Sequence, residues 1–336
     1  MWLFPILLLI ALVVFAACGD DEEEVAAPAA PAAPEVEEEF TIWVVVHGGI
    51  ADPFWKVVER GVKDAEAQIP GLTVNYTGPE VFDLDEFLAD VDTAIAAGPD
   101  ALVLTLTAPD AMDEPLRRAI DAGLPIIAIN APDLRLPVED RIPVLTYVGE
   151  DSFFIGVKAA QETLARFTPT RAVFGNHQPG AFNIQERGRG FIETLEAAGV
   201  DAEALDLTED AVQGAEIMAA FLTANPDVDV MFVTNTLRTE TIIPRLEDEG
   251  IVVGEGGVRI AQMDVSPQIL DFIGDGRVMF TMDQQQYMQG YLGVLFAYLK
   301  LKFDLAPPPI PVSTGPAVVT ADDIPRLKGL AEEGFR

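Results

Sequence analysis

The sequence predicts an α/β protein made of two doubly wound parallel sheets, and three observations lead to this fold class. Its 336 residues exceed one average domain, and a hydrophobic content of 49% is enough for two cores. From Phe40 onward, short apolar strands alternate with amphipathic helices. Residues 42–46 and 101–104 are continuously apolar, as expected for parallel strands that helices cover on both faces.

The elements follow one another in a regular order. Predicted strands cover residues 41–47, 72–76, 101–105, 125–129, 144–148, 172–175, 230–234, 259–263 and 278–282. Predicted helices cover residues 53–68, 85–97, 113–122, 154–166, 183–198, 212–224, 240–249 and 286–300. This order is typical of β-α-β units with right-handed crossovers, and so many strands fit two sheets better than one.

Composition excludes several classes of function. The net charge of -34, with only 21 Lys and Arg spread along the chain, argues against a nucleic-acid partner. The single cysteine, Cys18, allows no intrachain disulfide. With His47 and His177 as the two histidines, we expect no zinc site, and the sequence indicates no other metal and no cofactor.

The first forty residues indicate export from the cytoplasm. Residues 1–17 are almost wholly apolar and end in small residues, as in a signal peptide. Phe15-Ala16-Ala17-Cys18 resembles a bacterial lipobox, in which the cysteine carries the lipid; a plain N-terminal membrane anchor is the alternative. Residues 18–39, rich in Ala, Pro and Glu, are expected to be a disordered acidic tether outside the cytoplasmic membrane.

Polar side chains follow most of the predicted strands. Ligands of open parallel sheets bind beyond the carboxyl ends of the strands, where such side chains gather. The strand-end residues include Asp52, Asn130, Asn235, Asp264 and Gln284. Short amides and carboxylates satisfy hydroxyl groups, and Phe54 and Trp55 offer flat faces to a sugar ring, so the set favours a polyol ligand. Alternatively, the polar residues belong to ordinary turns and the two aromatic residues to the core.

Several motifs occur in an order that resembles a known family. They are Asp52-Pro53-Phe54-Trp55, the segment 186–191 that opens a helix, Thr234-Asn235-Thr236, Met263-Asp264 and the segment 283–291. Together they resemble the ribose-, galactose- and xylose-binding family of periplasmic proteins, which has the type I periplasmic binding protein fold. The resemblance extends from residue 41 to about residue 325.

The resemblance implies an organisation and a mechanism. Residues 40–149 with 286–313 would form the N-terminal lobe, and residues 150–285 with 314–336 the C-terminal lobe. Three crossovers near residues 149–151, 284–286 and 314–316 would act as a hinge that closes on the ligand. The family members are not enzymes, and deliver a sugar to the permease of an ABC transporter. A monomer suffices for this mechanism.

The resemblance also implies site residues. Asp52, Phe54, Trp55, Asn235, Asp264 and Gln284 match ligand-binding positions of the family. Asn130-Ala131 replaces the family's Asp-Arg pair, and Gln185 replaces its ligand-binding arginine. These departures leave Asp52 and Asp264 without an obvious cationic partner, which puts ribose and glucose in doubt and favours a ligand with an amine or many donor hydroxyls.

The remaining basic residues have different expected places. His47 and Arg238 are further candidates for the ligand site, and His47 fits a structural role equally well. We expect Arg187 and Arg189 on a helix surface, where they form salt bridges.

Rival functions fit less well. Residues 46–49 resemble the oxyanion turn of α/β-hydrolases, but Ser152, Ser266 and Ser313 all lack the G-x-S-x-G context. A transcription regulator would need a basic helix-turn-helix where this chain has an apolar and then acidic segment. A receptor of the same fold, for a signalling molecule or a chemotaxis partner, remains the alternative to a transport protein.

Overall fold

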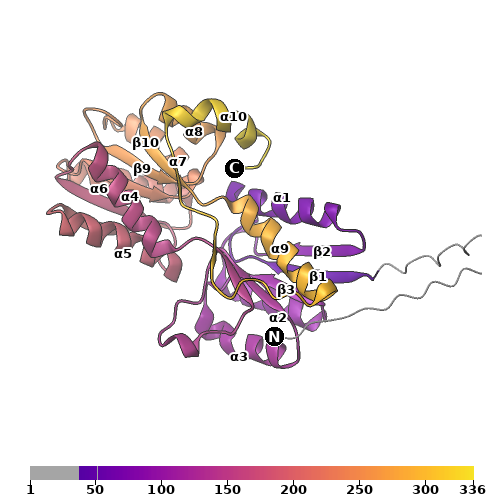
Figure 1. The fold of residues 1–336 in the computed structure, drawn as a ribbon. Helices are drawn as coiled ribbons and strands as arrows, with labels where there is room; N and C mark the ends of the chain where they lie inside the picture. Colours follow the sequence, from indigo (N-terminus) through magenta and orange to yellow (C-terminus); the bar gives the residue numbers. More distant parts are fainter. Residues whose placement is uncertain (1–37, 51) are drawn as a thin grey trace, which may run out of the picture. The chain divides into compact units, whose positions relative to one another are not determined.

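The computed structural model describes residues 38–50 and 52–336, so the predictions for the signal peptide, Cys18 and most of the tether lie outside the described residues. Two sheets of six strands each, with helices on their faces, make up the described part (Figure 1). Within it, every helix is too short or too polar to cross a bilayer.

The first sheet is parallel throughout and has the order β11-β5-β4-β3-β1-β2. Its strands are β1 (Phe40–Val45), β2 (Leu72–Thr77), β3 (Ala101–Leu104), β4 (Ile126–Ile129), β5 (Thr146–Gly149) and β11 (Val312–Ser313). Its helices are α1 (Pro53–Gln68), α2 (Leu84–Ala96), α3 (Pro109–Asp121) and α9 (Gln286–Phe303), and a short 3-10 turn, η1, covers Val138–Asp140. All residues of β3 and β4 are buried, as their continuous apolar sequences predict.

The second sheet has the order β12-β10-β9-β8-β6-β7, and only β12 is antiparallel to its neighbour. Its strands are β6 (Arg171–Asn176), β7 (Asp201–Asp206), β8 (Val230–Thr234), β9 (Arg259–Met263), β10 (Val278–Asp283) and β12 (Ala317–Val319). Its helices are α4 (Ser152–Arg166), α5 (Phe182–Ala197), α6 (Ala211–Ala224), α7 (Thr236–Asp248), α8 (Pro267–Gly274) and α10 (Ile324–Glu332), with the 3-10 turn η2 at Ala321–Asp323.

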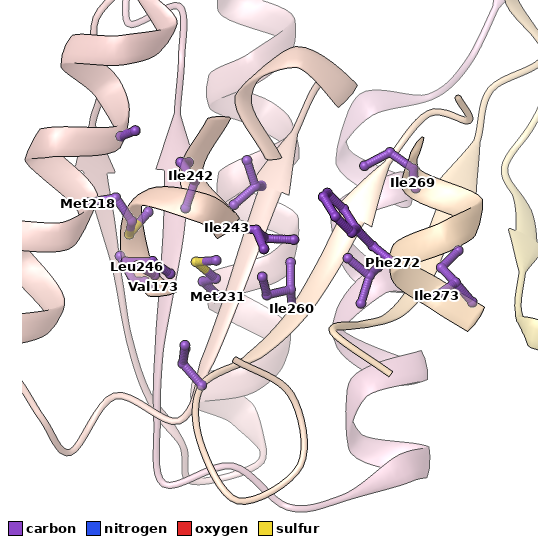
Figure 2. Close-up of a cluster of buried hydrophobic side chains, with 14 of the residues drawn as sticks. Val173, Met218, Met231, Ile242, Ile243, Leu246, Ile260, Ile269, Phe272 and Ile273 are labelled. Atoms are coloured by element: carbon purple, nitrogen blue, oxygen red, sulfur yellow. The ribbon is translucent and has the colours of Figure 1, made fainter. Parts of the chain in front are cut away.

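The core of the second lobe lies between the sheet and its helices. Figure 2 shows Met231 and Ile260 of the strands beside Met218, Ile242 and Ile243 of α6 and α7. All of these side chains are 1% exposed or less, and burying one of this size contributes about 1.5–3 kcal/mol. Such a core holds the strand ends, and the residues that follow them, in fixed positions.

The chain passes three times between the lobes, after β5, after β10 and between β11 and β12. The predicted fold class, two doubly wound lobes joined by three crossovers, is confirmed. Most predicted elements appear within a few residues of their expected bounds. The sequence did not predict β7, β11, β12, α8 and α10.

Glycines bring the two main helix pairs into backbone contact. In α4 and α5, a methyl group on Gly156 would lie 2.0 Å from Arg187 O, and one on Gly190 would lie 2.1 Å from Phe153 O. In α1 and α9, which lie side by side in Figure 1, Gly61 and Gly290 make the equivalent contacts with the partner helix. Each lobe therefore has one helix pair with no side-chain layer at the glycine contacts.

We expect Gly156→Ala to lower the free energy of unfolding by about 1–3 kcal/mol, since the added methyl group forces α4 away from α5. Urea unfolding measures the difference. Gly329→Ala in α10 is the matched control, because nothing lies within 4 Å of its added methyl group. That control should be neutral or slightly stabilising, and equal losses in both variants would contradict a packing effect.

Candidate functional site

A cavity of about 260 Å³ lies between the carboxyl ends of the strands of the two lobes. Both lobes contribute to its lining, which contains all but one of the residues that the sequence predicted. These are His47, Asp52, Phe54, Trp55, Asn130, Asn235, Arg238, Asp264 and Gln284. The strand-end residues therefore share one site instead of serving separate turns.

Three of these residues have left-handed backbones directly after their strands. The φ angles are 60° at Asn130 after β4, 91° at Asn235 after β8 and 78° at Asp264 after β9. Non-glycine residues adopt this region at a cost, and Asn and Asp bear that cost best. All three residues line the cavity, and backbone strain of this kind is typical of functional sites.

Asp52 joins the two lobes directly. Its Oδ1 accepts a hydrogen bond from the Phe54 amide at 2.9 Å and so caps α1. Its Oδ2 accepts a hydrogen bond from Asn235 Nδ2, also at 2.9 Å, across the cavity. The helix cap fixes the carboxylate in place, and the second oxygen holds the side chain that enters from the other lobe.

A chain of amides continues from the second lobe to the first. Gln284 Nε2 donates to Asp264 Oδ1 at 2.9 Å, and Asn130 Nδ2 donates to Gln284 Oε1 at 3.2 Å. Burial raises the pKa of Asp264 to about 7, although Gln284 and the charge of Arg187 oppose the rise. The Asp264 carboxyl is thus close to half-protonated at neutral pH while the cavity holds no ligand.

Aromatic rings form the apolar wall. The Phe54 and Trp55 rings meet edge to face at 4.8 Å, and the His47 ring meets Trp55 at 5.1 Å and Phe82 at 6.0 Å in the same way. Gly48 makes room for the indole, since a methyl group there would lie 1.6 Å from Trp55 Nε1. Burial lowers the pKa of His47 to about 3, so its imidazole is neutral.

Two arginines reach the cavity, and this corrects the prediction for Arg187. Instead of lying on the helix surface, Arg187 is buried and lines the cavity, and its Nη2 lies 2.8 Å from Glu150 Oε1. Arg238 lies 3.5 Å from the Glu209 carboxylate and donates to the Glu209 backbone oxygen. Arg189 is exposed and pairs with Glu186 and Glu193, as predicted. Two arginines therefore line the cavity, and each is paired with a glutamate.

Gln185 does not lie in the cavity, so the prediction for this residue is corrected. It is exposed, its Nε2 donates to Pro179 O, and with Arg189 it lines a separate surface hollow on α5. One turn of helix separates Asn183 from Arg187, and both face the cavity. Gln185 lies two residues from each of them, so it points to a different side of α5 and away from the cavity.

The sequence analysis did not include several residues that line the cavity. Glu80, Val81 and Phe82 come from the loop after β2, Glu209 comes from the loop after β7, and Ala211 is the first residue of α6. His177 follows β6, and its Nδ1 lies 2.9 Å from Thr234 Oγ1; burial lowers its pKa well below the usual value. These residues obey the same rule once β7 is known and every strand end is included.

Four carboxyl side chains (Asp52, Glu80, Glu209 and Asp264) and two arginines line the cavity, and each arginine is paired with a glutamate. Arg187 pairs with Glu150 and Arg238 with Glu209, while Asp52 and Asp264 accept hydrogen bonds from amides. Some buried polar atoms of lining residues have no partner among the described residues. The donors are Arg187 Nε and Arg238 Nε, the acceptors are Asn183 Oδ1 and Asn235 Oδ1, and His47 Nδ1 is either, depending on the tautomer. Among the residues that the structure describes, no three His, Cys, Asp or Glu side chains lie close enough together to hold a metal ion.

Two α/β lobes, joined by three crossings, that enclose a polar cavity define a ligand-binding protein of the two-lobe class. The chain belongs to the periplasmic binding protein domain family, whose model matches residues 42–304. The family consists of binding proteins, which agrees with the prediction that the chain is not an enzyme. The predicted resemblance to periplasmic sugar-binding proteins is confirmed at the level of the family.

Curated relatives match most of the chain. The xylose/arabinose-binding protein of Sulfolobus acidocaldarius is 29% identical over 304 residues, which are 87% of this chain and 74% of the relative. The D-ribose/D-allose-binding protein of Pseudomonas aeruginosa is 26% identical over 87% of this chain and 90% of its own length.

Solved structures match the fold. A carbohydrate transporter protein from Acidothermus cellulolyticus, in complex with myo-inositol, superposes with a TM-score of 0.80 at 23% identity and covers 89% of this chain and 100% of its own. GanP, a glucose-galactose binding protein from Geobacillus stearothermophilus, gives 0.73 at 22% identity, and covers 86% of this chain and 100% of its own. At these identities the likeness supports the type I binding protein fold and not a particular ligand.

Proposed function

We propose that this protein captures a small, uncharged, hydroxyl-rich ligand, a monosaccharide or a sugar derivative, and delivers it to an ABC transporter. The observation that carries the proposal is that the lining offers free hydrogen-bond donors and acceptors while each of its arginines already has a carboxylate partner. An anionic ligand would find no unpaired guanidinium, and a cationic ligand would compete with the amides that donate to Asp52 and Asp264. Hydroxyl groups both donate and accept, which suits the mixture of free donors and acceptors.

Size and shape support the same ligand class. A volume of about 260 Å³ is below the roughly 300–1,000 Å³ of pockets for drug-sized molecules, so a single sugar ring fits better than an oligosaccharide. Phe54 and Trp55 offer an apolar wall for the C–H face of a ring. The names of the relatives, which bind xylose, arabinose, ribose or allose, point to the same class.

Export and anchoring complete the proposal. Residues 1–17 serve as the signal peptide, Cys18 carries the lipid, and residues 18–39 tether a monomeric domain outside the cytoplasmic membrane. We also propose the lobe limits predicted above. A receptor for a signalling molecule would use the same cavity, and a neighbouring permease gene distinguishes transport from sensing.

A thermal-shift screen of the purified protein tests the ligand class. The panel contains D-xylose, L-arabinose, D-ribose, D-allose and myo-inositol, with glucosamine and putrescine as cationic probes. We expect a selective rise in the melting temperature with a neutral sugar or inositol, because a ligand that binds only the folded state stabilises it. Stabilisation by the cationic probes alone would contradict the proposal of an uncharged ligand. The tightest neutral binder is called the panel ligand below.

Asp264→Ala and Asn235→Ala should each weaken binding of the panel ligand by at least about 1 kcal/mol, because buried ligand hydroxyls lose partners. Isothermal titration calorimetry measures the affinities. Gln185→Ala is the matched control, since this residue lies outside the cavity and should not change the affinity. Wild-type affinity in both cavity variants would contradict the proposed site.

A further inference from the structure

A buried glutamine that does not line the cavity connects cavity residues to two crossings. Gln289 of α9 is 0% exposed. Its Oε1 accepts from Asn130 Nδ2 at 3.1 Å, and its Nε2 donates to Gln284 Oε1 at 3.3 Å and to Thr314 Oγ1 at 3.2 Å. Gln284 follows β10 at the second crossing, and Thr314 follows β11 at the third.

These contacts fix the orientation of the Asn130 amide. Its Nδ2 donates to both Gln284 Oε1, at 3.2 Å, and Gln289 Oε1, at 3.1 Å. A side-chain amide has two N–H donors, so both are used within the protein. Asn130 therefore offers its carbonyl oxygen, an acceptor, to a ligand in the cavity.

The same network reaches the first crossing. Tyr147 Oη lies 2.8 Å from the backbone oxygen of Asn130 and 2.8 Å from that of Glu150. The Thr314 amide donates to Gly149 O at 2.9 Å, which ties the third crossing to the first. One connected set of hydrogen bonds thus joins a cavity residue to all three crossings.

We propose that Gln289 is a positioning residue for ligand binding, and this inference rests on the proposed function. Gln289 acts through Asn130: its hydrogen bond orients the Asn130 amide so that the carbonyl oxygen faces the cavity. Gln289 also bonds Gln284 and Thr314, and so connects Asn130 to the second and third crossings. A ligand hydroxyl that donates to Asn130 meets an acceptor that is already oriented, so little ordering is needed on binding. A change of angle at the crossings strains the hydrogen bonds that orient the acceptor.

The first test removes both hydrogen-bonding groups of Gln289 while keeping its length. Gln289→Met should weaken the panel ligand about tenfold by calorimetry, the size expected when an oriented polar contact is lost. In the Asn130→Ala background, Gln289→Met should add less than about a twofold loss, because its effect passes through Asn130. A full tenfold loss in that background would overturn the proposal.

A matched control separates this role from helix packing. Val294 of α9 is also buried, and it packs in the hydrophobic core of the first lobe. Val294→Ala should lower stability but leave the affinity unchanged, and a loss of affinity equal to that of Gln289→Met would overturn the proposal. Gln289→Glu, which keeps the acceptor for Asn130 but loses the donor groups, should bind more tightly than Gln289→Met if both variants fold.

A second measurement needs no ligand. Hydrogen exchange of residues 312–316 should be faster in Gln289→Met and in Gln289→Glu, because Thr314 loses its hydrogen bond to α9. Unchanged exchange in both variants would overturn the proposal. If wild-type protein binds no neutral panel member, the proposed function fails, and the exchange measurement alone decides whether Gln289 holds the crossing.

Discussion

The affinity for the panel ligand should fall about tenfold for each pH unit below pH 7, the strongest effect expected for this protein. Burial raises the pKa of Asp264 to about 7 in the free cavity. A ligand hydroxyl that donates to Asp264 favours the carboxylate and lowers that pKa. Below pH 7, binding must therefore release a proton, and its cost grows as the pH falls.

The carboxyls of Asp264 and Glu209, and not the histidines of the cavity, should cause this dependence. The pKa of His47 is about 3 and that of His177 is also far below the usual value, so both stay neutral between pH 5 and pH 8. Burial also raises the pKa of Glu209 to about 7. Calorimetry from pH 5 to pH 8 should show that the affinity of Asp264→Asn depends less on pH than that of the wild type. Glu209→Gln measures how much of the remaining pH dependence comes from Glu209. An unchanged slope in Asp264→Asn would refute the assignment.

The raised pKa of Asp264 also makes the stability of the ligand-free protein fall as the pH rises. The Asp264 carboxyl titrates near 3.8 when unfolded and near 7 when folded, so the folded state binds more protons between these values. Its contribution to stability is fully present below about pH 4 and is lost as the pH rises to about 7. Ligand affinity and stability of the empty protein therefore change in opposite directions over this range.

Glu150→Ala should lower the free energy of unfolding by about 3–5 kcal/mol, because it leaves Arg187 buried without a counter-charge. The side chain of Glu150 is 0% exposed, and its Oε1 also accepts a hydrogen bond from Ser152 Oγ at 2.6 Å. Burial raises the pKa of Glu150, while the charge of Arg187 opposes the rise. Urea unfolding at neutral pH measures the loss.

A surface carboxylate provides the comparison. Glu162 of α4 pairs with Lys158 and Arg166 near the solvent, so Glu162→Ala should cost less than about 1 kcal/mol. Replacing both Glu150 and Arg187 by leucine should cost less than Glu150→Ala alone, because no unpaired charge remains in the lobe. A double variant less stable than Glu150→Ala would refute the unpaired-charge explanation.

The sequence predicted the strands that are buried on both faces and missed three of the four edge strands, β7, β11 and β12. Residues 101–104 and 230–233 are continuously apolar, and the predicted strands there agree within one residue with β3 and β8. By contrast, β7 has the sequence DAEALD, whose carboxylates face solvent at the edge of the second sheet. An edge strand needs little apolar surface, so its sequence resembles that of a loop.

The site was predicted from residue types at strand ends, and this rule has a clear limit. It found Asn130, Asn235 and Asp264 because a parallel sheet brings its carboxyl ends to one edge. It says nothing of which helix face meets the cavity, so it could not correct Gln185, which was chosen from the resemblance, or Arg187, which was expected on the helix surface. The ion pair of Arg187 with Glu150 joins residues 37 positions apart, and no local pattern indicates it.

The glycine contacts between α1 and α9 fix the aromatic wall relative to the second crossing. With backbones in contact at Gly61 and Gly290, no layer of side chains separates the two helices there. Helix α9 starts directly after the second crossing, and α1 starts at Pro53, directly after its cap residue Asp52. The two aromatic rings, and the carboxylate that binds Asn235 of the other lobe, are therefore held as one unit on α9.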